Sequence, residues 1–127
     1  MLTGNPETAV KEFFRLFNTG DVDAVLAMYE PQAILVAQDG QVAQGTTRLR
    51  AALNGFLSLK PTLTIHHSRL VVAGDLALSL VRWSLSGTGP DAKPVYLEGT
   101  TSDVLRRQGD GTWLFVIDNP WGATILG

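Results

Sequence analysis

The chain has 127 residues, of which 45% are hydrophobic and 17% charged, with a formal net charge of -2 and no cysteine. This length predicts one domain over residues 1–127. The missing basic stripe argues against a nucleic-acid partner, and the missing cysteines exclude disulfides, zinc–thiolate sites and cysteine nucleophiles. No apolar run approaches the roughly 20 residues that cross a membrane, and no signal-peptide pattern is visible, so we expect a cytoplasmic protein without a membrane partner.

Three helices are predicted in the N-terminal half. Helix-start residues, proline stops and a C-terminal glycine give the ranges 5–20, 21–29 and 46–59. The first helix carries apolar side chains at i, i+3, i+4 and i+7, which are Val10, Phe13, Phe14 and Phe17. The second is expected to end near Tyr29, just before Pro31.

Strands dominate the rest of the chain. A short one is predicted over 33–37, and four longer ones follow at 63–72, 76–86, 94–106 and 112–119. The last two form a hairpin around a tight turn, Gln108 to Gly111. Helices followed by a β-meander predict an α+β fold, with three N-terminal helices packed on one face of a curved antiparallel sheet.

Two strands carry apolar residues on both faces, although the helices can cover only one. They are the strand through Trp83 and the strand through Phe115. An antiparallel sheet with one wet face alternates more cleanly than this. The second face therefore predicts a homodimer through the convex side of the sheet, with Trp83 near the centre of the interface.

The order of these features resembles the nuclear transport factor 2-like superfamily, which includes steroid delta-isomerases, SnoaL-like polyketide cyclases and scytalone dehydratase. The segments that carry the resemblance are FNTGDVDAVLAMYEPQAIL, the loop to Gly45, GDLAL, and DVLRRQGDGTWLFVIDNP. The resemblance implies a sheet curled into a cone, with an internal pocket for a small molecule closed by the helices.

The catalytic groups of the steroid isomerases are not all present by this resemblance. Their carboxylate base falls near Ala37 and their tyrosine falls on Phe13. Their protonated aspartate falls on Ser102 or, one residue along, on Asp103. An isomerase of that particular mechanism is therefore not expected; the alternative is a shifted loop that brings Asp39 to the position of the base.

The register implied by the resemblance places a set of side chains inside the cone. Leu78, Leu80, Arg82, Ser84, Glu98, Thr100 and Ser102 are expected inward, as are Leu114, Val116 and Asp118 on the last strand. The remaining expected pocket residues are Phe13, Phe17, Tyr29, Phe56, His67 and Trp121. The set is mostly apolar with a few polar groups, as in typical ligand sites.

Asp118 is the predicted general acid or base, with Arg82 orienting it or binding an anionic or carbonyl group. The alternative is that Arg82, Glu98 and Asp118 form an ion-pair cluster that only ties strands together. Trp121 could stack on a flat ligand or plug the cone against the first helix. His66 and His67 face opposite sides of a strand and cannot chelate one ion, so no metal is predicted.

The sequence leaves three functions open. The first is an isomerase, cyclase or dehydratase acting on a small hydrophobic carbonyl compound, without metal or nucleotide cofactor. The second is a non-catalytic domain that binds a hydrophobic ligand. The third is a dimerisation domain whose own side chains fill the cone. A carboxylate in a dry cavity would favour the first.

Overall fold

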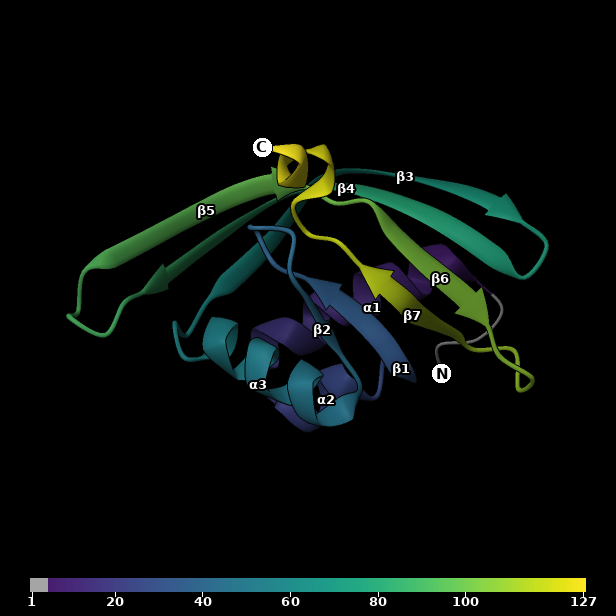
Figure 1. The fold of residues 1–127 in the computed structure, drawn as a ribbon, viewed down its shortest axis with the longest axis horizontal. Helices are drawn as coiled ribbons and strands as arrows, with labels where there is room; N and C mark the ends of the chain where they lie inside the picture. Colours follow the sequence, from purple (N-terminus) through teal and green to yellow (C-terminus); the bar gives the residue numbers. More distant parts are fainter. Residues whose placement is uncertain (1–4) are drawn as a thin grey trace.

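The computed structural model describes residues 5–127, and it places three helices on the concave side of a curved sheet (Figure 1). The helices are α1 (Pro6–Thr19), α2 (Val22–Leu26) and α3 (Thr46–Leu57). A short 3-10 helix that the sequence did not predict, η1 (Gly122–Leu126), follows the last strand. The three N-terminal helices and the α+β class are thus confirmed. No helix within residues 5–127 is long and apolar enough to cross a membrane.

Helix α1 forms as its sequence predicts. The Asn5 side chain accepts hydrogen bonds from the backbone N–H groups of Glu7 and Thr8, and Gly20 ends the helix at a φ of 78°. Helix α2 is shorter than predicted, because Tyr29 begins a strand instead of ending a helix. The backbone N–H of Phe115 donates to the carbonyl of Met28 at 2.8 Å, so this segment pairs with the strand that contains Phe115 instead of continuing the helix.

Seven strands form one sheet in the order β2-β1-β7-β6-β4-β3, with β5 also paired to β4. Their bounds are β1 (Tyr29–Val36), β2 (Val42–Gln44), β3 (Thr62–Ala73), β4 (Leu76–Thr88), β5 (Pro94–Thr100), β6 (Asp103–Arg107) and β7 (Trp113–Asp118). All pairs are antiparallel except β1 with β7, which makes the sheet mixed. Strand β2 was not predicted.

The strand predicted over 94–106 is divided at Thr101 and Ser102. Its first part, β5, pairs with the second half of β4, and β6 pairs with the first half. At the break, the N–H of Thr101 donates to the Val81 carbonyl at 2.8 Å, and the Thr101 hydroxyl accepts from the Val81 N–H at 3.0 Å. Thr101 therefore satisfies the backbone of β4 between the end of the β5 ladder and the start of the β6 ladder.

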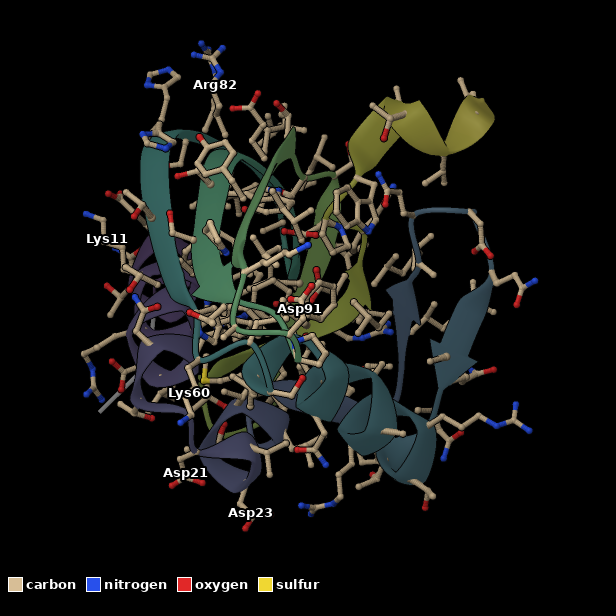
Figure 2. The ribbon with its side chains drawn as sticks, turned by 90° about the vertical axis from the view of Figure 1, so that its left-hand side faces the viewer. Lys11, Asp21, Asp23, Lys60, Arg82 and Asp91 are labelled. Atoms are coloured by element: carbon tan, nitrogen blue, oxygen red, sulfur yellow. The ribbon has the colours of Figure 1, made fainter. Side chains whose placement is uncertain are left out.

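The face expected for β4 is reversed. The inward side chains are Ala77, Ser79, Val81, Trp83 and Leu85, all buried. Leu78 is 40% exposed, Leu80 is half-buried, and Arg82 extends outward (Figure 2). Glu98 and Thr100 share this outer face with Arg82, because Thr100 pairs directly with Arg82 and Glu98 with Ser84. Trp83 lies in the core, so it cannot be the centre of a convex interface.

Two β-bulges reverse other assignments. His66 is the extra residue in β3, so His67 lies opposite Arg82 on the outer face. Val116 is the extra residue in β7, between the pairs Leu105–Phe115 and Val104–Ile117. As a result Phe115 and Asp118 are both buried inside, whereas Leu114 and Val116 are half-buried.

The C-terminal turn at Gly122 fits closely against the strand break. Gly122 has a φ of 56°, and a Cβ there would lie 2.4 Å from the Thr100 carbonyl oxygen.

We predict that Gly122→Ala lowers the free energy of unfolding by more than about 1 kcal/mol, through both backbone strain and this clash. Gly109→Ala is the control, since its Cβ would meet nothing within 4 Å. Urea unfolding measures both; equal stabilities would contradict the role given to this turn.

Candidate functional site

Three strand ends bring together Tyr29, Asp103 and Asp118, which we call the carboxyl cluster. Tyr29 begins β1, Asp103 begins β6 and Asp118 ends β7. The Tyr29 hydroxyl donates to Asp118 Oδ2 at 2.5 Å, and the Asn119 N–H donates to Asp103 Oδ1 at 2.9 Å. All three side chains are buried. The cluster therefore joins three segments that are far apart in the sequence.

The two carboxyl groups influence each other's ionisation. No Lys, Arg or His among residues 5–127 forms an ion pair with either group. Burial, and next the nearby charge of Asp118, raise the pKa of Asp103 well above its usual range. Burial also raises the pKa of Asp118, opposed by hydrogen bonds from Tyr29 and Asp103. Two adjacent buried carboxylates, neither of them paired with a described cationic side chain, resist double ionisation, and the larger rise in pKa makes Asp103 the member that holds its proton more tightly.

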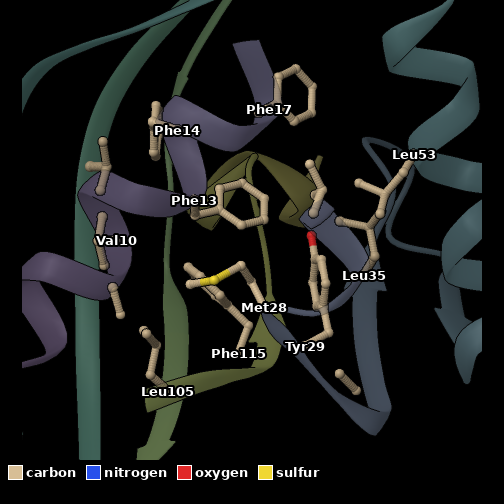
Figure 3. Close-up of a cluster of buried hydrophobic side chains, with 14 of the residues drawn as sticks. Val10, Phe13, Phe14, Phe17, Met28, Tyr29, Leu35, Leu53, Leu105 and Phe115 are labelled. Atoms are coloured by element: carbon tan, nitrogen blue, oxygen red, sulfur yellow. The ribbon is translucent and has the colours of Figure 1, made fainter. Parts of the chain in front are cut away.

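Tyr29 is held as a neutral phenol. Burial, and next the charge of Asp118, raise the pKa of Tyr29 well above its usual value. Its ring stands edge-on to Phe13, with centroids 5.7 Å apart, and lies 5.8 Å from the ring of Phe115 (Figure 3). This packing fixes the ring, so that the hydroxyl is a permanent donor that orients the Asp118 carboxylate.

Both carboxyl groups of the cluster line an inner chamber of about 50 Å³ between α1, α3 and the sheet. Its other lining residues are mostly aromatic or aliphatic: Phe13, Phe14, Phe17, Leu35, Leu53, Phe56, Leu63, Trp83, Leu85, Thr101, Phe115 and Pro120. Tyr29 is not among them and stands behind Asp118. The chamber is thus an apolar, weakly solvating site with its polar groups on one wall.

A larger groove of about 460 Å³ adjoins the inner chamber. It is lined by the β1–β2 hairpin, α3, β5 and the C-terminal turn, through Leu35, Val36, Ala37, Gln38, Gln41, Val42, Ala43, Ala52, Phe56, Leu97 and Trp121. Leu35 and Phe56 line both spaces and form the partition between them. We call this space the outer groove.

The structure brings together some of the predicted site residues and separates others. Phe13, Phe17 and Phe56 line the inner chamber with Asp118, and Tyr29 contacts Asp118. Trp121 lines the outer groove and packs edge-on against Trp83, with centroids 5.4 Å apart. Away from the chamber lie Arg82, His67, Glu98 and Thr100, which are exposed, and Leu80, Ser102 and Val116, which are half-buried.

The predicted cluster of Arg82, Glu98 and Asp118 is therefore wrong. Arg82 and Glu98 lie on the outer face, while Asp118 is inside. The partner of Asp118 is Asp103, which sequence reasoning reached only as the alternative to Ser102. The alternation along this segment could have identified Asp103. Thr101, Asp103 and Leu105 are buried, the residues between them are half-buried, and the strand pairs with β4.

The histidines do not contribute to this site. His66 Nε2 lies 2.7 Å from the Ser84 hydroxyl. His67 is exposed beside Arg82. Within the described residues 5–127, no group of three His, Asp or Glu side chains is arranged to hold a metal ion.

The fold and its chamber correspond to a known family. The SnoaL-like domain family matches residues 10–116, and the chain belongs to this family. No curated protein sequence matches the chain.

Solved structures of the same fold are numerous. A nuclear transport factor 2-like superfamily protein from Salmonella enterica superposes with a TM-score of 0.79 at 15% identity, covering 90% of this chain and 85% of that one. SalBIII, an epoxide hydrolase/cyclase-like enzyme in pyran ring formation in the polyether salinomycin, gives 0.74 at 24% identity, covering 93% and 91%. A candidate dehydratase of the NTF2-like family from Streptomyces avermitilis gives 0.75 at 16%, covering 87% and 89%. These likenesses show the fold.

The shared proton gives the cluster a pH signature. Both aspartates have a folded-state pKa above the unfolded value of about 3.9. Above about pH 4 these two groups bind more protons in the folded state than in the unfolded state, so their contribution to the free energy of unfolding falls as pH rises toward the folded pKa values. We predict a smaller fall from acid to neutral pH in Asp103→Asn, which keeps an acceptor for the Asn119 N–H.

Chemical denaturation across this pH range checks the prediction. Glu98→Gln is the matched control, because it neutralises an exposed carboxylate on the outer face. Its profile should run parallel to that of the wild type. A parallel profile for Asp103→Asn as well would show that the buried pair does not share a proton.

Proposed function

We propose that this protein is an acid–base enzyme that isomerises, cyclises or dehydrates a small, largely apolar compound bearing a carbonyl or hydroxyl group. The observation that supports this most is the pair of buried carboxyl groups on one wall of an apolar chamber, next to a fixed tyrosine hydroxyl. Buried titratable pairs of this kind, with pKa values moved from the ordinary range, are typical of catalytic sites.

In this proposal Asp118 is the base and Asp103 the acid. Ionised Asp118 removes a proton from a C–H or O–H group of the substrate, while neutral Asp103 donates its proton to a substrate oxygen. The pair then carries one proton as before, now on Asp118, and exchange between the two groups restores the starting state. Tyr29 acts through Asp118 as a positioning residue, because it does not line the chamber.

The similarity in fold to enzymes of several reaction types supports this proposal and leaves the reaction itself to experiment. SalBIII is described as an epoxide hydrolase/cyclase-like enzyme, and the Streptomyces avermitilis protein as a candidate dehydratase. Each of these reaction types moves protons between carbon and oxygen atoms or between oxygen atoms. The second candidate function, non-catalytic binding of a hydrophobic ligand, uses the same chamber and groove without turnover.

Turnover of a carbonyl compound by the wild type separates the two functions, and Asp118→Asn then tests the assignment of the base. With a carbonyl compound that the wild type converts, we expect kcat to fall by at least about 100-fold, the usual contribution of a positioned base. Ligand-induced thermal stabilisation should remain, since the amide has the same shape. Glu98→Gln, an exposed carboxylate variant, should keep wild-type kcat. Full activity in Asp118→Asn would remove Asp118 from the proposed mechanism.

We also propose that the protein is a homodimer through the outer face of the sheet. A row of apolar side chains crosses five adjacent strands on this face: Val71, Leu78, Val104, Ile117 and Ile34, each directly paired with the next. Val71 is 54% exposed, Leu78 40% and Ile117 37%. Monomeric proteins seldom expose a continuous apolar row of this kind.

Light scattering coupled to size exclusion tests the dimer. We predict twice the chain mass for the wild type and the chain mass for Leu78→Lys, since a charge within the row would be buried in the interface without a partner. Val72→Lys is the control: Val72 is 53% exposed but points to the opposite face. A wild-type monomer at micromolar concentration would contradict the proposal.

A further inference from the structure

The inner chamber alone is too small for a substrate. Its volume is about 50 Å³, well below the roughly 300 Å³ at the lower end of ligand sites. Only a single functional group, such as a carbonyl with its neighbouring atoms, fits beside Asp103 and Asp118. The remainder of any larger molecule must lie outside the chamber.

The outer groove adjoins this chamber, and its volume of about 460 Å³ lies within the usual range of ligand sites. The two spaces share Leu35 and Phe56 as walls. Leu35 is buried on β1 and fixed in the core, whereas Phe56 is half-buried on α3. Phe56 is thus the shared wall residue whose rotation would open a passage between the two spaces.

The lining of the outer groove indicates the chemistry of its occupant. Among the lining residues that lie within 5–127, Gln38 and Gln41 are the polar ones, and the others are aliphatic or aromatic. None of these described lining residues is charged. This composition suits an uncharged apolar body and offers nothing to a phosphate or carboxylate.

We infer that the outer groove is the subsite for the body of an elongated, uncharged and mostly apolar substrate, whose oxygen-bearing end passes Phe56 into the inner chamber. This inference rests on the proposed function for the chemistry at the carboxyl cluster. It adds the substrate class, a chain or ring system that extends well beyond the reacting group. Binding energy then comes mainly from the groove, remote from the reacting atoms.

A series of 2-alkanones of increasing length tests the inference, with binding followed by tryptophan fluorescence, because Trp83 and Trp121 line the two spaces. Each added methylene should tighten binding about fourfold until the groove is filled, as expected for a CH₂ group leaving water. Affinity that does not rise with chain length would overturn the inference, as would a lack of binding at every length.

A blocking variant locates the binding. Val42→Trp, at an exposed position of the groove, should make affinity level off at a shorter ketone. Val72→Trp is the matched control, equally exposed but outside the groove, and should follow the wild type. Gln41→Trp is a second blocking variant if circular dichroism shows that the first is not native. Identical curves for blocking and control variants would place the ketones elsewhere.

Asp118→Asn separates this inference from the proposed function. It should keep the dependence of affinity on chain length, because the groove is unchanged, while turnover is lost. If Asp118→Asn loses turnover but affinity does not depend on chain length in any variant, the proposed subsite is wrong and the proposed function stands. If length dependence holds while Asp118→Asn keeps full turnover, the subsite stands and the acid–base assignment is wrong.

Discussion

The burial of two carboxyl groups without a cation is the constraint on which this structure depends. Desolvation makes two charges there very unfavourable, so the pair must hold a proton between them and accept hydrogen bonds from fixed donors. Those donors, the Tyr29 hydroxyl and the Asn119 N–H, come from the start of β1 and the end of β7. The strand break and the bulge at Val116 meet this requirement, because they turn Asp103 and Asp118 into the same interior.

The surrounding core makes such a pair chemically useful. Aromatic side chains of α1 and β7 line much of the inner chamber, and such an apolar lining solvates charge only weakly, which strengthens electrostatic interactions at the carboxyl groups. The same close packing leaves little free volume beside the carboxyl groups. Recognition is therefore separated from chemistry in our proposals: a small chamber holds the reacting group, and the outer groove takes the rest of the molecule.

The inward and outward faces of the strands were predicted less well than the elements themselves. The helix stripe with Phe13 and Phe17 and the approximate ranges of the long strands followed from periodicity and turn residues, while the register implied by the family resemblance placed Asp118 inside. The predicted faces of β4 and β5 were both reversed, because the prediction placed Ser102 inside instead of Asp103. Residues that pair across two strands share a face, so Arg82 and Glu98 were placed inside as well. His67 was misplaced by the bulge at His66.

By itself, the sequence determined the helices, the order of most strands and the α+β class, since these depend on local spacing, caps and turns. It also favoured a SnoaL-like cone with Asp118 inside. Only the tertiary structure decided that Asp103 is the partner of Asp118, that Tyr29 leaves its helix to begin a strand, and that Trp83 is core. The physical reason is that a one-residue bulge reverses a strand face, and the burial that selects the correct register involves residues distant in sequence.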